Sequence, residues 1–332
     1  MGSSLVEYWK QRDAVVGGRC LPTANSRVSF AAADRNLDDA ARAYSSITPF
    51  DILLFPQYTG YVTSKPAVTF RDQYGPWAVI AGASEGTGSA FAHSLARRGL
   101  SCVLVAWAGP LAEVAEEIRT QYGVECVTAN IDLSATDAFD RILDATGGRE
   151  IGLYVANAGS DRFGSRYLDH DVEDWLGLLA MNVSTTMRAC HHFGRQMRAR
   201  RRGGLLIVNS GACYGGGSFL ATYTGCKGFL LNFAEGLWSE LRPYGVDVLT
   251  MVLSMTRTPM FLRLLTEKGV PEPAGLASPM DVVEQALERL PHGPVHNWGL
   301  ADDEGGYAVT SAAGRRARVL AIDASSKRIY GD

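Results

Sequence analysis

The chain has 332 residues, of which 46% are apolar and 20% are charged, and its formal net charge is −3. This is ordinary globular composition, and the charge gives no global bias toward nucleic acid or anionic membranes. No apolar run approaches the roughly 18 residues that span a bilayer, and no secretory signal is visible, which predicts a cytoplasmic protein.

Six cysteines are spread along the chain, and no two of them form a C-x-x-C pair. No metal-ligand spacing such as H-E-x-x-H occurs either, so no metal site is expected. Free thiols in a reducing cytoplasm are expected, rather than a disulfide framework, for Cys20, Cys102, Cys126, Cys190, Cys213 and Cys226.

Residues 1–70 form an N-terminal extension that does not share the pattern of the rest of the chain. They contain a possible helix over Asp38–Tyr44 and a short apolar segment over Phe50–Phe55. The extension could cover the sheet, contribute to a dimer contact or line the site, and the sequence leaves these roles open.

From about Tyr74 onward, apolar runs alternate with helical patterns such as Ser89–Arg98 and Leu111–Tyr122. Continuous apolar strands separated by helices imply a parallel sheet covered on both faces. Residues 71–332 are therefore expected to form an α/β domain with a Rossmann-type doubly wound parallel sheet in three α/β/α layers. The expected strands are Trp77–Ala81, Leu100–Ala106, Val124–Ile131, Ile151–Ala156, Leu205–Val208 and Val246–Leu253.

Residues 256–280 follow the last expected strand and contain the irregular apolar stretch TPMFLRLLTEKGVPEPAGLA. Because ligands bind beyond the carboxyl edge of such sheets, a substrate lid is one hypothesis, and a plain surface helix with a loop is the alternative. Ser278 and Pro279 have the pattern of an N-cap and a first helical position, so they predict a late helix through Leu290.

The segment VIAGASEGTG, residues 79–88, places Gly82, Gly86 and Gly88 between a strand and a helix. One glycine permits the tight turn, one lets the backbone approach a pyrophosphate, and one allows close helix–strand packing. The helix N-terminus adds free N–H groups and a positive dipole end. The loop therefore predicts a dinucleotide site, with a structural turn as the alternative.

The residue after the second strand normally selects the cofactor, through an acid that binds the ribose hydroxyls or an arginine that accepts a 2′-phosphate. Trp107 stands at that place, and Glu85 adds a negative charge to the glycine loop. This charge leans slightly against a 2′-phosphate and leaves the preference unresolved. Asp132, at the end of the third strand, could bind the adenine amino group or could be only a cap or turn residue.

Tyr223 and Lys227 are four residues apart in a helical pattern and therefore share one face. A phenol ordinarily loses its proton near pH 10, and a nearby ammonium favours the phenolate, which can act as acid or base. Ser210 follows a strand and can donate a hydrogen bond to a substrate oxygen. Alone, the pair could be a core tyrosine with a snorkelling lysine, but Ser210 and the glycine loop favour catalysis.

These motifs resemble the short-chain dehydrogenase/reductase family over about residues 70–331. The segments YGPWAVIAGASEGTG and REIGLYVANAG are most similar to its branch of 17β-hydroxysteroid dehydrogenases and long-chain 3-ketoacyl reductases. The resemblance assigns catalysis to Asn182, Ser210, Tyr223 and Lys227. It assigns NAD(P)(H) binding to Gly82, Ser84, Glu85, Gly86, Thr87, Gly88, Trp107, Asp132, Leu133, Asn157, Ala158, Gly159, Tyr223, Lys227 and Thr258.

The resemblance implies reversible hydride transfer between a nicotinamide and a carbonyl or secondary alcohol. Tyr223 would be the general acid/base, and Lys227 would favour its phenolate and hold the ribose hydroxyls. Ser210 would orient the substrate oxygen, and Asn182 would help to hold a water in a proton relay. A hydrophobic small molecule is the expected substrate, a homodimer or homotetramer is the expected assembly, and no nucleic acid partner is expected.

Several positions around the cofactor depart from the usual pattern of the family, namely Thr87, Trp107, Ala156 and the pair Leu253-Ser254. A redox-neutral biosynthetic enzyme, such as a cyclase, dehydratase or isomerase with Tyr223 as acid/base, is therefore an alternative. A non-catalytic binding protein is a third hypothesis, which the complete tetrad disfavours.

Overall fold

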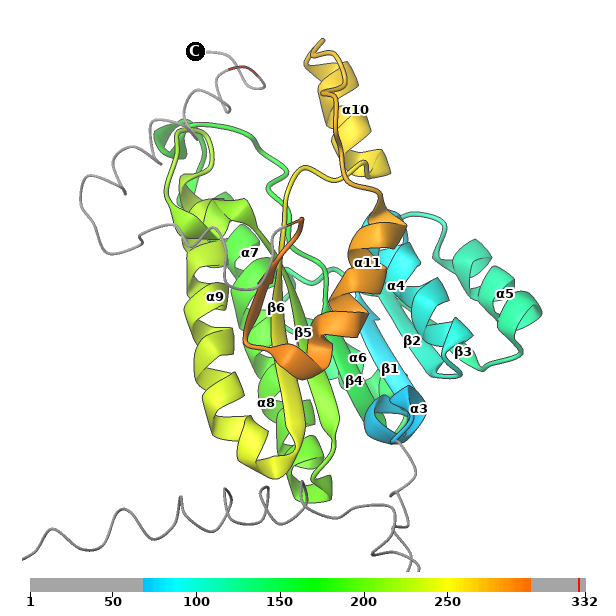
Figure 1. Ribbon diagram of the computed structural model, residues 1–332. Coiled ribbons are helices and arrows are strands. Elements are labelled where there is room, and N and C mark those ends of the chain that lie inside the picture. The colour runs from blue at the N-terminus through cyan, green and yellow to red at the C-terminus, as the bar shows by residue number, and fades with distance from the viewer. Residues whose placement is uncertain (1–67, 300–327, 329–332) are drawn as a thin grey trace, which may run out of the picture. The chain divides into compact units, whose positions relative to one another are not determined.

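A computed structural model of the protein describes residues 68–299 together with Arg328 (Figure 1). The helix expected over Asp38–Tyr44, the apolar segment Phe50–Phe55 and Cys20 lie outside the described residues. The N-terminal extension and the boundaries of the catalytic domain therefore stay predictions.

Seven parallel strands of the described region form one sheet in the order β3-β2-β1-β4-β5-β6-β7. The order reverses between β1 and β4, and the carboxyl ends of strands at such a switch point are where doubly wound folds bind ligands. This confirms the predicted fold class. The strands are β1 (Trp77–Ala81), β2 (Ser101–Ala106), β3 (Cys126–Asn130), β4 (Ile151–Ala156), β5 (Gly203–Ser210), β6 (Val246–Leu253) and β7 (Val295–Asn297).

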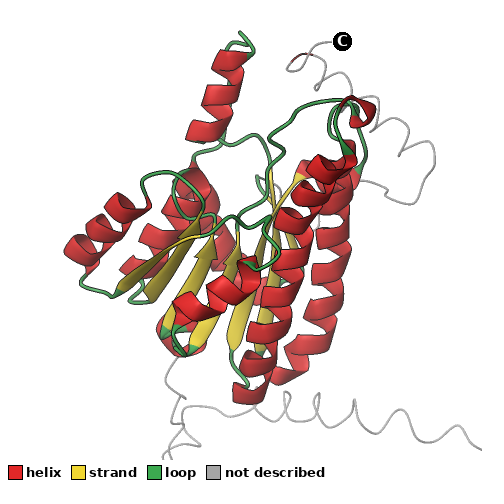
Figure 2. Ribbon diagram, turned by 180° about the vertical axis from the view of Figure 1, so that it is seen from behind, coloured by secondary structure: helices red, strands yellow, loops and turns green. Residues whose placement is uncertain are grey.

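Helices cover both faces of the sheet, as Figures 1 and 2 show from opposite sides. Helices α4, α5 and α11 bury residues on one face, and α6, α8 and α9 bury residues on the other. The helices are α3 (Phe70–Tyr74), α4 (Gly86–Arg97), α5 (Leu111–Tyr122), α6 (Ala138–Thr146), α7 (Val172–Leu179), α8 (Thr185–Arg200), α9 (Ala221–Leu241), α10 (Pro259–Glu267) and α11 (Pro279–Arg289).

The apolar runs form strands because both of their faces are covered. All five residues of β1 are buried, and alternate residues point into different cores. Ala78 and Ile80 join the cluster under α4 and α11, whereas Val79 and Ala81 join the cluster under α8 and α9. This period of two explains why a central parallel strand has a continuous apolar sequence rather than an alternating one.

The two ends of the segment between β6 and α11 lie next to each other. Thr256 and Ala277 form an isolated β-bridge, and the ion pair from Arg257 to Glu272, 2.7 Å between Nε and Oε1, crosses the same excursion. Helix α10 buries Leu265 and leaves Met260 48% exposed. In both views α10 stands out from the carboxyl edge of the sheet.

The late helix starts where the sequence predicts, because the Ser278 hydroxyl accepts a hydrogen bond from the Asp281 N–H. The cysteines of the described part are free thiols, as expected. Among the described residues, no helix is both long and apolar enough to cross a bilayer.

Candidate active site

The glycine loop leaves no room for side chains at two of its positions. A Cβ atom on Gly88 would lie 1.8 Å from the Gly82 carbonyl oxygen, and one on Gly82 would lie 2.8 Å from the Ala158 nitrogen. Gly82 and Gly86 also have positive φ angles of +85° and +59°, which favour glycine. The loop is therefore a bare backbone turn between β1 and α4.

Helix α4 begins at this loop with its N-terminal N–H groups directed toward the carboxyl edge of the sheet. Glu85 is the N-cap residue, and within the described chain its side chain makes no cap hydrogen bond. Free N–H groups and the helix dipole suit a phosphate, and the missing side chains allow the close approach that a pyrophosphate needs. The loop thus fits the dinucleotide that the sequence predicts.

Thr87, which replaces the aliphatic residue usual at this position of the family pattern, makes a side-chain hydrogen bond. Its hydroxyl donates to Asn157 Oδ1 at 2.7 Å, and Asn157 Nδ2 donates to the Gly82 carbonyl oxygen at 2.8 Å. These two hydrogen bonds join the Asn-Ala-Gly turn after β4 to the glycine loop. An aliphatic residue at position 87 could not make the first of these bonds.

The two loops that would face an adenosine ribose lie against each other. A Cβ on Gly109, which has a φ of +95°, would be 2.9 Å from Ser84 Oγ. Trp107, between β2 and this glycine, is 64% exposed. Neither an acid nor an arginine ends β2, so the usual selection of the cofactor at this strand is missing.

Asp132 lies in the turn after β3, and its carboxylate stabilises that turn. Its Oδ1 accepts from the Ser134 N–H at 2.9 Å and from the Ser134 hydroxyl at 2.6 Å. Burial raises the pKa of Asp132, but the hydrogen bonds from Ser134 outweigh this effect and hold that pKa below its ordinary value. The neighbouring Leu133 is buried, and its carbonyl oxygen accepts from Thr185. Contact of these two residues with adenine stays a prediction.

Helix α9 brings the predicted pair together. Lys227 Nζ lies 5.5 Å from the centroid of the Tyr223 ring and donates to the Val208 carbonyl oxygen at 3.2 Å. Lys227 is only 2% exposed, and this burial lowers the pKa of its amine to about 8. An ammonium held in this position can favour the tyrosine phenolate.

Asn182 reaches the same place from a π-helical turn, Ala180–Ser184, that joins α7 and α8. A Cβ on Gly159 would meet Asn182 Oδ1 at 2.6 Å and Lys227 Nζ at 2.9 Å, so both groups converge on this glycine. The amide Nδ2 donates to the Leu178 carbonyl oxygen at 3.0 Å, whereas Oδ1 is buried and accepts no hydrogen bond within the described region. Single π-turns are frequent at functional sites.

Ser210 ends β5, and its hydroxyl oxygen accepts from the Ala212 N–H at 3.2 Å. This bond leaves the hydroxyl hydrogen able to donate to a ligand. The β5–β6 register sets Ser210 opposite Leu253, so the unusual pair Leu253-Ser254 lies beside it. Ala156, at the end of β4, is 3% exposed and packs in the core under α8 and α9.

Asn209 is a residue of this site that the sequence did not single out. It is 2% exposed; its Nδ2 donates to the Lys227 carbonyl oxygen at 3.1 Å, and its Oδ1 accepts from the Ser210 N–H at 2.9 Å. It therefore links the serine and the lysine of the tetrad. A polar residue inside an otherwise apolar strand was the available signal.

Arg263 was also not expected. Its guanidinium binds both carboxylate oxygens of Glu85, at 2.6 Å and 3.0 Å, across 178 residues of sequence. A Cβ on Gly86 would lie 2.9 Å from Thr258 Cγ2, at the start of the same helix α10. Thr258 caps α10 by accepting from the Phe261 N–H. The segment 256–280 therefore approaches the glycine loop through both the Glu85–Arg263 ion pair and the packing of Thr258 at Gly86.

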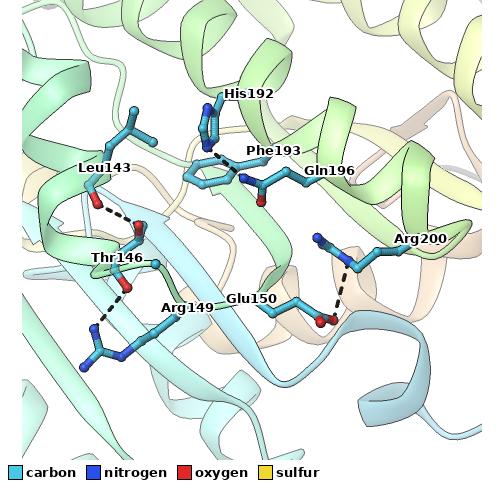
Figure 3. Close-up of a pocket in the computed structure, with 9 residues that line it drawn as sticks. Leu143, Thr146, Arg149, Glu150, His192, Phe193, Gln196 and Arg200 are labelled. Carbon is cyan, nitrogen blue, oxygen red and sulfur yellow. Dashed lines mark hydrogen bonds and ion pairs between the residues drawn. The ribbon is translucent and has the colours of Figure 1, made fainter.

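A pocket of about 460 Å³ lies elsewhere, between α6, α8 and the amino end of β4 (Figure 3). Gln196 there is hydrogen-bonded to His192, and Arg200 pairs with Glu150. None of the predicted site residues lines this pocket. The candidate active site lies instead at the opposite, carboxyl edge of the sheet.

Comparison with known proteins agrees with this geometry. A family model described as short chain dehydrogenase matches residues 76–268. The 7beta-hydroxysteroid dehydrogenase of Mediterraneibacter gnavus is 31% identical over 228 residues, which cover 67% of this chain and 86% of that protein. The very-long-chain 3-oxoacyl-CoA reductase of Laccaria bicolor is 34% identical over 183 residues, which cover 54% of each.

A solved structure from work on 7beta-hydroxysteroid dehydrogenase stereoselectivity is similar with a TM-score of 0.65 and 29% identity. The match covers 70% of this chain and 90% of that one. Both comparisons agree with the branch that the sequence indicates.

Proposed function

This chain belongs to the short-chain dehydrogenase family, and we propose that it transfers hydride between NAD(P)(H) and the carbonyl or secondary-alcohol carbon of a hydrophobic small molecule. As a family member it is an NAD(P)-dependent oxidoreductase acting on the CH-OH/C=O pair. The observation that carries the proposed catalytic assignment is the convergence of Lys227 and Asn182 on Gly159, with the Tyr223 ring beside the lysine.

In the direction of reduction, the Tyr223 phenol donates its proton to the substrate oxygen, and in oxidation the phenolate takes that proton back. Lys227 favours the phenolate through its positive charge. Ser210 donates a hydrogen bond to the same substrate oxygen and stabilises its developing charge. When it is bound, the nicotinamide supplies or accepts the hydride.

Asn182 is assigned to the proton relay. Its amide nitrogen is anchored to the Leu178 carbonyl oxygen, and this fixes the direction of the buried Oδ1 next to Lys227. That oxygen can accept a hydrogen bond from a water, and such a water would connect Lys227 to solvent.

The cofactor would lie along the carboxyl edge of the sheet. The glycine loop and the N-terminus of α4 would hold its pyrophosphate, and Asn157, Ala158 and Gly159 would lie beside the nicotinamide half. Lys227 would bind the nicotinamide ribose, Asp132 and Leu133 the adenine, and Thr258 the carboxamide side.

The substrate class rests on the relatives and on the lid. Steroids and long-chain acyl groups, which the relatives' names specify, are apolar ligands. Residues 256–280 would close over such a ligand with the exposed Met260 of α10. Because these relatives are dehydrogenases and reductases, they favour net redox chemistry and give no support to the redox-neutral alternative.

Two further assignments complete the proposal. The enzyme works in the cytoplasm, as its cysteine usage and apolar-run lengths predict. It assembles as a homodimer or homotetramer through the apolar side chains that α7, α8 and α9 leave exposed, including Leu176, Met187 and Phe229.

The decisive variant is Tyr223→Phe. Purified protein would be assayed by nicotinamide absorbance against a panel of apolar ketones and alcohols that includes hydroxysteroids. The turnover should fall by about 10²- to 10⁴-fold, because the proton donor is lost. Tyr244→Phe, in the turn before β6 at the opposite edge, should keep full activity. Nicotinamide turnover that survives Tyr223→Phe would refute the mechanism.

A further inference from the structure

The ion pair between Glu85 and Arg263 lies where a cofactor would be selected. Glu85 is the N-cap residue of α4, next to Ser84, and Ser84 packs against Gly109 of the loop that follows β2. In doubly wound folds this loop faces the adenosine ribose. The guanidinium of Arg263 is thus held at the ribose corner of the cofactor site by an acid of the glycine loop.

The loop after β2 contains no charged side chain that could recognise the ribose hydroxyls or a 2′-phosphate. It runs Trp107-Ala108-Gly109, without the acid that binds two ribose hydroxyls or the arginine that binds a 2′-phosphate. Left unpaired, the Glu85 carboxylate would repel a 2′-phosphate. When Glu85 is paired with Arg263, the two side chains have no net charge together, and they place one guanidinium at this part of the cofactor site.

We infer that Arg263 of α10 is the residue that recognises a 2′-phosphate when NADP(H) binds, by directing N–H groups of its guanidinium to the phosphate while it stays beside the Glu85 carboxylate and neutralises it. This inference rests on the proposed function of the site, and it adds to it the cofactor preference that the sequence leaves unresolved. It also means that the predicted lid helps to select the cofactor, because the guanidinium that binds the phosphate comes from α10 and not from a loop that directly follows a strand of the cofactor half.

The Arg263 side chain can turn toward a phosphate at little cost in stability. The side chains of Arg263 and Glu85 are 59% and 29% exposed, and exposed ion pairs contribute little to stability. A phosphate offers the planar guanidinium the same two-pronged geometry with more negative charge than a carboxylate.

The test compares Arg263→Ala with Arg257→Ala in the full-length protein. Arg257 is a matched control, because its side chain is 57% exposed and pairs with Glu272 of the same segment rather than with a residue of the glycine loop. Dissociation constants for NADP⁺ and NAD⁺ would be measured by calorimetry. Arg263→Ala should weaken NADP⁺ binding by about 10- to 100-fold and change NAD⁺ binding by less than about three-fold. Arg257→Ala should leave both constants near wild type.

Glu85→Gln provides a second measurement, because it removes the competing charge and keeps a hydrogen-bond acceptor. It should raise the preference for NADP⁺ over NAD⁺ by several-fold. If Arg263→Ala weakens both nucleotides equally, or neither, the inference is overturned and the proposed function stands. If wild-type protein binds none of the four nicotinamide nucleotides, the proposed function itself fails and the inference falls with it.

Discussion

The buried amine of Lys227 makes the stability of this protein depend on pH. Burial lowers the pKa of this amine to about 8, against an ordinary 10.5. Between these two values the unfolded chain binds a proton that the folded chain does not, so the free energy of unfolding rises with pH. Below about pH 8 both states are protonated, so the free energy of unfolding no longer changes with pH through this group, and the folded state bears the full cost of burying the charged amine.

We therefore expect the wild type to gain stability over Lys227→Met as the pH rises. Urea unfolding without nucleotide would be compared at about pH 7.5 and about pH 9.5, and the difference between the two proteins should grow by about 2 kcal/mol in favour of the wild type. A difference that stays constant, or shrinks, would contradict the burial of a titrating lysine here.

Most of the candidate site could be predicted at the residue scale, because its residues fall in short local motifs. The spacing of Tyr223 and Lys227 is a property of one helix, and the glycine loop is a property of one turn. The Glu85–Arg263 pair could not be predicted, since it joins residues 178 positions apart that only the folding of α10 brings together. Asn209 was missed because its two hydrogen bonds depend on the placement of β5 against α9.

At the scale of elements, the strands of the sheet centre were predictable because burial on both faces demands a continuous apolar run. The edge strand β7 was not, since it is only three residues long and contains His296 and Asn297. The π-helical turn that carries Asn182 has no sequence signature either. A pattern of apolar spacing does not distinguish such a turn from the α-helices on either side of it.

Residues 256–280, the predicted lid, give a test at this same scale. The ends of this segment are joined by the Thr256–Ala277 bridge, and α10 reaches the glycine loop through Arg263 and Thr258. A bound dinucleotide adds contacts at that loop, so it should slow opening of the segment and its cleavage by a protease.

Limited trypsin digestion would measure this at Lys268, in the lid, with and without saturating nucleotide. Cleavage after Lys268 should slow several-fold with nucleotide, whereas cleavage after Arg201, in the exposed turn between α8 and β5, should not change. Equal lid cleavage in both conditions would favour the plain surface helix over a lid.

At the scale of the whole molecule, the doubly wound architecture followed from the alternation of elements, but the outer surface did not. Helices α7, α8 and α9 leave large apolar side chains exposed, and Phe229 of α9 is 42% exposed and stacked on Phe233 at 5.6 Å. Large exposed apolar groups on neighbouring helices are typical of an interface between protein chains. This is the surface on which the proposed homo-oligomer would form.

The substitution Phe229→Glu tests that assembly, because it puts a charge where two copies would pack and leaves the sheet core untouched. Sedimentation velocity at micromolar concentration should find wild-type dimers or tetramers and a shift of Phe229→Glu toward monomers, since an unpaired charge in an apolar interface is costly to desolvate. Met260→Glu, at a comparably exposed position of α10, should assemble like the wild type. A wild type that is monomeric at every concentration, or a Phe229→Glu variant that assembles normally, would show that these apolar side chains serve another purpose.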